Sequence, residues 1–391
     1  MIRAGHFPAI AAALVGAFLV MAFPTRADDM QTGLQSLIDG FLAKYGFPGA
    51  TVAIALPDGT VIVAATGLAD VEAGTPMTPD SRMLAASIGK TFVAATVLAL
   101  ESEGRLSRDD LLADHLGDRA WFGGLPNART MTIGHLLHHS AGLPDHVYLP
   151  EFQGSWAQLT AGDAAVAPED LIGFVSGQEP LFEAGTAWAY SDTGYLLLGL
   201  VIEKVTGAAW QEAVRARFLG PLELSDTFPS DRRALPGLAI GYLAPDNPFG
   251  LPERTADAEG RLLWNPAVEG AGGGFASTSR DLALWGHLLF GGKAMAAPYL
   301  DRLLDPVPVA PDDPGVLYGS GVAIYTDTPR GPVYGHGGWI PGYVSSLRYY
   351  ADHGVTVAFQ INTDAGFLDG TSDLAPALEA ALADLAIKAL P

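Results

Sequence analysis

The chain has 391 residues, of which 49% are hydrophobic and 17% are charged, and its formal net charge at pH 7 is −21. This composition is typical of a globular protein with a large core and excludes a disordered chain. The excess of acidic residues disfavours binding to nucleic acids or to anionic membranes. Because the sequence has no cysteine, disulfides and a lipid anchor on cysteine are excluded.

The first residues have the pattern of a secretory signal peptide. Arg3 precedes an apolar run over 9–23, and Thr25-Arg26-Ala27 offers small residues for cleavage. The run is too short for a confident membrane span. We therefore expect residues 1–27 to be removed and the mature chain, 28–391, to be periplasmic or secreted without stable membrane insertion. An uncleaved N-terminal anchor is the alternative.

The mature chain begins with a predicted helix and a predicted β-hairpin. Apolar residues recur at helical spacing over 30–45. Two β-rich runs, 50–56 and 60–65, then flank Pro57-Asp58-Gly59, which is typical of a turn between antiparallel strands. A helix that starts near Ser87 is expected to end at Gly104.

The middle and the end of the chain differ in their patterns. From about residue 91 to 268 most periodic segments are typical of helices, and a second β-rich block and a helix over 373–390 follow. Strands at both ends predict an α/β protein of the α+β type, with one antiparallel sheet formed by N- and C-terminal segments and flanked by helices. The strands expected in the second block are 321–326, 332–334, 343–350 and 355–361.

We expect a single catalytic domain over 28–391. Its α/β part comprises about 28–100 and 269–391, and its mainly helical part comprises about 101–268.

Ser87 and Lys90 lie at the start of a predicted helix. Three residues are nearly one helical turn, so the two side chains share a face and can exchange a proton. A serine becomes a nucleophile when a base removes its proton, and a lysine can serve if burial or a nearby cation lowers its pKa. A serine cap followed by a solvated lysine is the ordinary interpretation of an isolated match. The helix is apolar on every turn, which predicts burial and disfavours that interpretation.

Two further motifs follow in order, Tyr190-Ser191-Asp192 and His336-Gly337-Gly338-Trp339. With Ser-x-x-Lys, they make the chain resemble the serine β-lactamase-like and penicillin-binding-protein superfamily, which includes class C β-lactamases, D,D-carboxypeptidases, D-aminopeptidases and related esterases. Segments 135–144 and 272–283 also resemble blocks of that family. The resemblance covers nearly all of the mature chain.

The resemblance implies a serine hydrolase that cleaves an ester or amide through an acyl-enzyme, with β-lactamase or D,D-peptidase activity among the possible forms. It implies that Ser87 is acylated and that Lys90 and Tyr190 share the proton transfers, although it does not decide which of them is the base. The partner would be a small-molecule or peptide substrate, and no cofactor or metal is expected. The oxyanion hole would consist of the N–H groups of Ser87 and Trp339, and the substrate-binding residues would be Asp192, His336, Gly337, Gly338 and Trp339.

The motifs depart from the family pattern at two places. Asp192 stands where the family usually has Asn; beside Lys90 it would keep that lysine protonated and shift the base role to Tyr190. Asp192 can equally be interpreted as a helix N-cap, and both roles can hold. The second departure is the absence of hydroxyls at Gly337 and Trp339, where carboxylate-binding relatives usually have them. It favours a less anionic ester or amide over a D-Ala-D-Ala peptide.

Other residues in the sequence, and other functions, allow further interpretations. His135, His138 and His139 have metal-ligand spacing, but no Glu follows His135, so a metal site is not predicted. Tyr148, Trp188 and Trp264 are interpreted as core residues. A penicillin-binding or sensor protein that is only acylated is the alternative function. An α/β-hydrolase, in which Lys90 would be dispensable, is the third.

Overall fold

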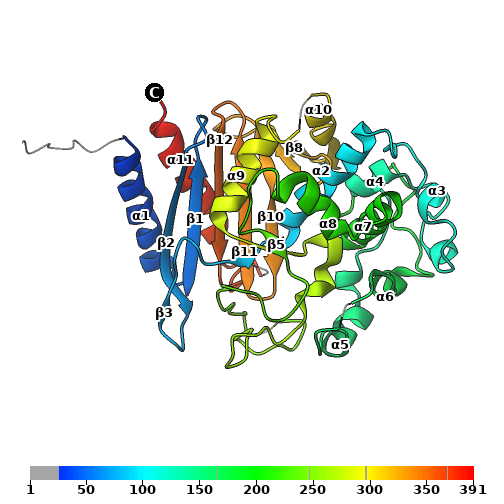
Figure 1. Cartoon of the computed structure of the whole chain (residues 1–391), viewed down its shortest axis with the longest axis horizontal. Coiled ribbons are helices and arrows are strands. Elements are labelled where there is room, and N and C mark those ends of the chain that lie inside the picture. The colour runs from blue at the N-terminus through cyan, green and yellow to red at the C-terminus, as the bar shows by residue number, and fades with distance from the viewer. Residues whose placement is uncertain (1–25, 165, 246, 296, 368) are drawn as a thin grey trace, which may run out of the picture.

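A computed structural model describes residues 26–391 except 165, 246, 296 and 368, and within them the largest element is a nine-stranded antiparallel sheet (Figure 1). The strand order is β3-β2-β1-β12-β11-β10-β9-β8-β7. The strands are β1 (Gly49–Ala55), β2 (Val61–Asp70), β3 (Thr75–Pro76), β7 (Val307–Ala310), β8 (Asp313–Tyr318), β9 (Ala323–Tyr325), β10 (Val333–Ile340), β11 (Tyr343–Tyr350) and β12 (Val355–Ile361).

The sheet joins the two ends of the described chain. β1 pairs with β2 on one side and with β12 on the other, where Ala53 lies opposite Ala358. All seven residues of β1 and of β12 are buried. Helices α1 (Arg26–Tyr45) and α11 (Leu374–Lys388) cover one face of these strands, and α9 (Ser279–Phe290) covers the other. Burial on both faces explains why their sequences are continuously apolar. The predicted sheet of N- and C-terminal segments is therefore confirmed.

Two hydrophobic cores lie on the two faces of the sheet. The smaller one packs Leu34 and Ile38 of α1 with Leu378 and Leu382 of α11 against the strands. The larger one joins the other face of the sheet to the helical part of the chain, which Figure 1 shows beside the sheet. Its two longest helices are α2 (Gly89–Ser102) and α7 (Asp192–Thr206), which are apolar on most of their surface.

The remaining helices of the helical part are shorter. They are α3 (Leu112–Leu116), α4 (Ile133–Leu137), α5 (Pro150–Leu159), α6 (Pro168–Ile172) and α8 (Trp210–Val214). The described residues of 230–265 contain neither a helix nor a strand and pair only through isolated bridges. The mainly helical part expected over 101–268 thus ends in a long irregular stretch.

The sequence missed parts of the sheet. β7 and β8 were not predicted, and β10 continues to Ile340 although its predicted strand ended at Tyr334. The His336-Gly337-Gly338-Trp339 motif therefore lies within a strand.

The predicted signal peptide falls almost entirely outside the described residues, which include only Arg26 and Ala27 of it, at the start of α1. Within the described part of the chain, no helix combines the length and the apolar character needed to cross a bilayer.

Candidate active site

Ser87 lies in a short 3-10 turn, η1 (Ala86–Ile88), that leads into α2. The chain enters this turn from β4 (Met83–Leu84), which pairs with β6 (Phe275–Ser277) in a small sheet completed by β5 (Phe228–Pro229). Ala86 has a φ of 48°, a left-handed conformation that non-glycine residues rarely adopt. Strained residues of this kind concentrate at functional sites, and this one directly precedes the predicted nucleophile.

The glycine-rich run before β6 allows close packing against this turn. A Cβ on Gly273 would lie 2.8 Å from the carbonyl carbon of Ala86, and one on Gly89 would lie 2.3 Å from the carbonyl oxygen of Gly273. Only glycine fits at these two positions, so the glycines of this run shape the nucleophile turn.

Lys90 is fully buried and directs its ammonium group at three acceptors. Its Nζ atom donates to Ser87 Oγ at 3.1 Å and to the carbonyl of Gly272 at 2.5 Å, and it forms an ion pair with Asp192. These contacts match the three donors of a charged ammonium group. The predicted proximity of Ser87, Lys90 and Asp192 is therefore present in the structure.

Asp192 is the first residue of α7, and Ser191 occupies the N-cap position. The helix receives no side-chain cap, and the carboxylate of Asp192 contacts Lys90 instead. The interpretation of Asp192 as an N-cap is wrong, because Asp192 is the first residue inside the helix and Ser191 holds the cap position.

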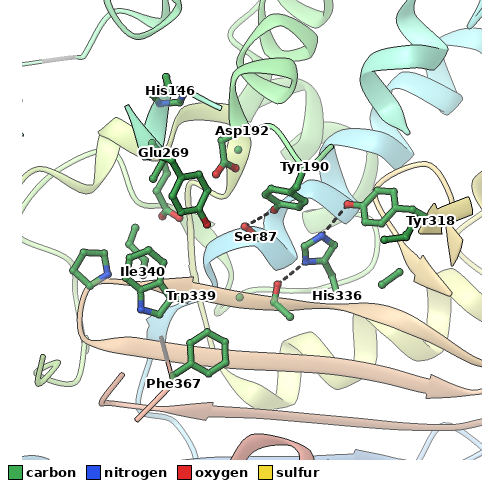
Figure 2. A pocket seen from close by; sticks show the side chains of 18 of the residues that line it. Ser87, His146, Tyr190, Asp192, Glu269, Tyr318, His336, Trp339, Ile340 and Phe367 are labelled. Carbon is green, nitrogen blue, oxygen red and sulfur yellow. Dashed lines mark hydrogen bonds between the residues drawn. The ribbon is translucent and has the colours of Figure 1, made fainter. Parts of the chain in front are cut away.

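Tyr190 completes the group around the serine oxygen. Its hydroxyl donates to Ser87 Oγ at 2.8 Å (Figure 2). Burial, together with the negative charge of Asp192, raises the pKa of Tyr190 well above its usual value. Tyr190 is therefore a phenol at neutral pH.

His336 is held in one tautomer by a chain of hydrogen bonds. The N–H of Ser191 donates to His139 Nδ1, so His139 donates through Nε2 to the hydroxyl of Tyr318 at 3.1 Å. Tyr318 in turn donates to His336 Nε2 at 2.9 Å, and His336 Nδ1–H donates to the carbonyl of Gly337 (Figure 2). Burial and the charge of Lys90 lower the pKa of His336 to about 3. His336 is thus neutral.

Gly338 and Trp339 lie where β10 passes the nucleophile turn. β9 pairs with Val333–Gly335, and the following part of β10 packs against η1. A Cβ on Gly338 would lie 2.4 Å from the carbonyl oxygen of Ala85, so glycine is required for this approach. Gly337 faces the opposite side of the strand, where its nearest neighbour is Arg348. The backbone of Trp339 is thus beside the turn that carries Ser87.

Ser87 opens into a cavity of about 420 Å³. One wall consists of a row of aromatic rings: Trp156 lies 4.2 Å from Phe249 between ring centroids in a tilted arrangement, and Phe249 stacks at 6.3 Å from Trp339. The indole N–H of Trp339 donates to Asp364 at 3.1 Å, which fixes that ring. The predicted substrate-binding residues Asp192, His336, Gly337, Gly338 and Trp339 all line the cavity.

The interpretation of three aromatic residues as core is corrected in part. Trp264 is fully buried in the core, as expected. Tyr148 is 69% exposed and lines the cavity, and Trp188 lines it too. Both lie in segments that surround the cavity entrance, which periodicity alone does not reveal.

Sequence reasoning also missed two carboxyl groups near Lys90. Glu269 comes from η6 (Pro266–Gly272) and lines the cavity; burial raises its pKa to about 8. Asp145 lies behind Asp192, and burial together with that neighbouring charge raises its pKa to about 7. Burial lowers the pKa of His146, which hydrogen-bonds Thr193, to about 4. The one sequence signal was the position of Glu269 beside the glycine-rich run.

The cavity also contains one guanidinium group among its described lining residues, that of Arg348. It reaches the cavity beside Gly337 from the α11 face of the sheet and pairs with Glu379 at 3.1 Å. Its charge is therefore largely neutralised.

The three histidines with metal-ligand spacing take separate roles. His135 closes a capping box with Thr132, His138 contacts Ser320, and His139 joins the chain to Tyr318. In the part of the chain that the structure describes, no group of three or more His, Asp or Glu side chains is arranged to hold a metal ion.

Known proteins resemble this chain over most of its length. The model of the Beta-lactamase family matches residues 34–382. Penicillin-binding protein 4* of Bacillus subtilis (strain 168) is 26% identical over 340 residues, covering 85% of this chain and 71% of that protein. Penicillin-binding protein 4 of Amycolatopsis lactamdurans is 28% identical over 340 residues, covering 84% of each.

Solved structures share the fold as well. A D-stereospecific amidohydrolase from Streptomyces sp. is 29% identical with a TM-score of 0.72, covering 87% of this chain and 95% of that chain. A D-amino acid amidase from Ochrobactrum anthropi SV3, complexed with L-phenylalanine amide, is 25% identical with a TM-score of 0.75, covering 92% and 98%. The chain belongs to the Beta-lactamase family, and its resemblance to penicillin-binding proteins and related hydrolases is confirmed.

Proposed function

We propose that this member of the Beta-lactamase family cleaves an ester or amide bond through an acyl-enzyme on Ser87. The observation that carries the proposal is the double contact of Ser87 Oγ, with Tyr190 at 2.8 Å and Lys90 at 3.1 Å, at the floor of an open cavity. Such an arrangement of nucleophile and proton carriers is what covalent catalysis requires.

The charges of the site suggest the route of each proton in acylation. Ser87 attacks the carbonyl carbon, and its proton passes to Lys90 while Lys90 transfers one of its own protons to Asp192 through their ion pair. Tyr190 keeps its proton at neutral pH because its pKa is raised, and it transfers that proton to the leaving group. The N–H groups of Ser87 and Trp339 would stabilise the negative oxygen.

Deacylation returns both protons. Water loses a proton to the Tyr190 phenolate as its oxygen attacks the acyl carbon. The bond to Ser87 Oγ then breaks, and that oxygen regains a proton from Lys90, which recovers its own from Asp192. The enzyme ends in its starting state.

The lining of the cavity supports a preference for neutral or amine-bearing substrates. Asp192 places a carboxylate where the resembled proteins usually carry an amide, and a carboxylate on the substrate would be repelled by it. The aromatic wall of Trp156, Phe249 and Trp339 favours a large apolar group.

Export to the periplasm or medium, which rests on the signal-peptide pattern of residues 1–27, is part of the proposal.

Labelling of Ser87 tests the mechanism. A fluorophosphonate probe or a labelled penicillin should add one adduct to the protein, and Ser87→Ala should abolish both labelling and turnover of p-nitrophenyl esters. Ser102→Ala, at the far end of α2, is the matched control and should behave as wild type. Labelling that persists in Ser87→Ala contradicts the proposal. A single burst without turnover would instead indicate a penicillin-binding or sensor protein.

A further inference from the structure

One carboxyl group in the cavity takes no part in these proton transfers. Glu269 lies on η6 and lines the same cavity as Asp192 and Ser87 (Figure 2). Its Oε2 atom is buried and accepts no hydrogen bond from any residue that the structure describes. A buried carboxyl group without a partner is costly, and the cost falls when a ligand supplies a donor or a positive charge.

The surroundings of Glu269 keep it unpaired. Lys90, the nearest cation, has its three donors engaged by Ser87, Asp192 and Gly272. A Cβ on Gly273 would lie 2.4 Å from Glu269 Oε1, so the carboxyl group occupies space that any other residue at 273 would fill. The glycine thus leaves room for a carboxyl group whose Oε2 atom receives no hydrogen bond from the described residues, although the charge of Lys90 acts on it.

Asp192 adds a second carboxyl group on the same wall. One of its oxygens binds Lys90, and its side chain remains 24% exposed, towards the cavity. The aromatic rings of Trp156, Phe249 and Trp339 also line the cavity. The cavity therefore offers acceptors beside an apolar surface.

We propose that Glu269 and Asp192 form an ammonium-binding subsite, so that the substrate is an ester or amide with a protonated amine beside a large apolar group. The inference rests on the proposed function, because it places the amine relative to the carbonyl that Ser87 attacks. An ammonium group has three N–H donors, and the second oxygen of Asp192 and the carboxyl group of Glu269, both on residues that line the cavity, can accept hydrogen bonds from them.

A matched pair of substrates tests the subsite. Phenylalanine p-nitroanilide, in both enantiomers, carries the amine, and 3-phenylpropanoyl p-nitroanilide lacks it. Wild type should turn over the better phenylalanine enantiomer with a kcat/KM about tenfold or more above that of the desamino compound. Glu269→Gln keeps the shape of the side chain but cannot become the carboxylate that an ammonium group would stabilise, so the ratio of the two kcat/KM values should fall towards one, by about tenfold or more. Glu253→Gln, which changes an exposed carboxylate outside the cavity, should leave the ratio unchanged.

A binding measurement makes the test independent of turnover. Calorimetric titration with 2-phenylethylamine should show binding at least tenfold tighter than with 2-phenylethanol. Because burial raises the pKa of Glu269 to about 8, the affinity for the amine should rise between pH 6 and 8.5 while the amine stays protonated. Lys90 and Asp192 also face Glu269, and Asp145 and His146 lie behind Asp192. The part of the pH dependence that Glu269→Gln removes belongs to Glu269.

The outcomes distinguish failure of the ammonium-binding proposal from failure of the hydrolase proposal. The subsite proposal is overturned if the amine and the alcohol bind equally well. It is also overturned if Glu269→Gln lowers kcat/KM equally for both anilides. Either result holds even if Ser87 is labelled and wild type cleaves substrate. If Ser87 is not labelled and no ester or anilide is cleaved, the hydrolase proposal fails, and the calorimetric comparison alone decides whether the ammonium site exists. A cooperative thermal unfolding transition of Glu269→Gln shows that the variant is folded.

Discussion

A serine oxygen that accepts hydrogen bonds from both Lys90 and Tyr190 still carries its own proton, and the site must accept that proton. Neither neighbour is a free base in the resting state, since Lys90 matches a charged ammonium group and the pKa of Tyr190 is raised well above its usual value. Through their ion pair, Lys90 can transfer a proton to the carboxylate of Asp192. The Asp that replaces the usual Asn therefore gains a role in the proposed mechanism.

The two proton carriers should act as a unit. Lys90→Ala and Tyr190→Phe should each lower kcat by roughly 10² or more, the usual size of a general acid–base contribution. The double variant should lose much less than the product of the two single losses, because each change disables the same transfer. Steady-state kinetics with a chromogenic ester measure these losses. A Lys90→Ala enzyme that stays fully active would contradict the mechanism and favour a conventional base elsewhere.

Asp192 should determine how the charge of a substrate affects its kcat/KM. Asp192→Asn removes the repulsion of a substrate carboxylate, so the kcat/KM ratio of an anionic to a neutral ester should rise, by about tenfold if one close charge pair is relieved. The comparison uses a succinyl and a butyryl ester of the same phenol. An unchanged ratio would show that Asp192 does not act on the substrate. Faster cleavage of D-Ala-D-Ala peptides than of neutral esters by wild type would contradict the specificity argument and leave the serine mechanism intact.

At the scale of elements, the contact of β10 with η1 positions the nucleophile. Gly338→Ala should disturb this contact, because the added Cβ would lie 2.4 Å from Ala85 O and 2.2 Å from Ser345 Oγ. Overpacking of this kind typically costs about 1–3 kcal/mol, so the Tm should fall by several degrees. Gly337→Ala is the matched control, since its nearest neighbours would lie at 3.7 and 4.0 Å. Equal Tm values for the two variants, measured by thermal scanning, would refute the role of this contact.

The elements also show what local pattern can and cannot predict. The hairpin of β1 and β2 and the helices α1 and α11 follow from periodicity and turn residues, and the structure has them. β7 and β8 escaped prediction because Pro308, Pro314 and Gly315 interrupt their β-rich character, which is tolerated near a sheet edge. β10 was cut short because two adjacent glycines indicate a turn locally; the packing against η1 that requires glycine is visible only in three dimensions.

At the scale of the whole molecule, the site brings together segments that are far apart in the sequence. Only the occurrence of several motifs in a characteristic order could suggest that these segments meet. Ser87, Tyr190 and His336 were predicted to be site residues because their ordered motifs resemble those of the family, and the cavity is lined by all three. Glu269 and Asp145 belong to no such motif, and their importance arises from burial beside Lys90 and Asp192. Burial of a single carboxyl group depends on the complete fold, so the sequence could not predict it.

The buried carboxyl groups should make stability depend on pH. Glu269 ionises near its ordinary pKa of 4.5 in the unfolded chain and only near 8 in the folded one. Its contribution to stability is thus present at low pH and is lost as the pH rises from about 4.5 to 8. Glu269→Gln cannot ionise, so its Tm relative to wild type should increase from pH 5 to pH 8 by about 2 °C or more, which corresponds to roughly 2 kcal/mol in a protein of this size.

His336 and Asp145 titrate in both proteins, and the difference between the two therefore isolates Glu269. The low pKa of His336 has the opposite effect, since it removes stability as the pH falls below about 6.5. Calorimetric scans at both pH values measure the two curves. Parallel curves for wild type and Glu269→Gln would show that Glu269 is ionised at neutral pH in the folded state.

The pairing of β1 with β12 has a consequence for the timing of activity during synthesis. The ribosome makes β1 first, yet the strand that covers its edge lies some 300 residues later, at Val355–Ile361. Until that segment emerges, the apolar edge of β1 has no partner, and the β10 strand that holds the nucleophile turn is also missing. Such non-local pairing forms slowly and exposes unpaired edges meanwhile. We therefore expect a chain that is interrupted before β10 to lack the assembled site, although it already contains Ser87, Lys90 and Tyr190.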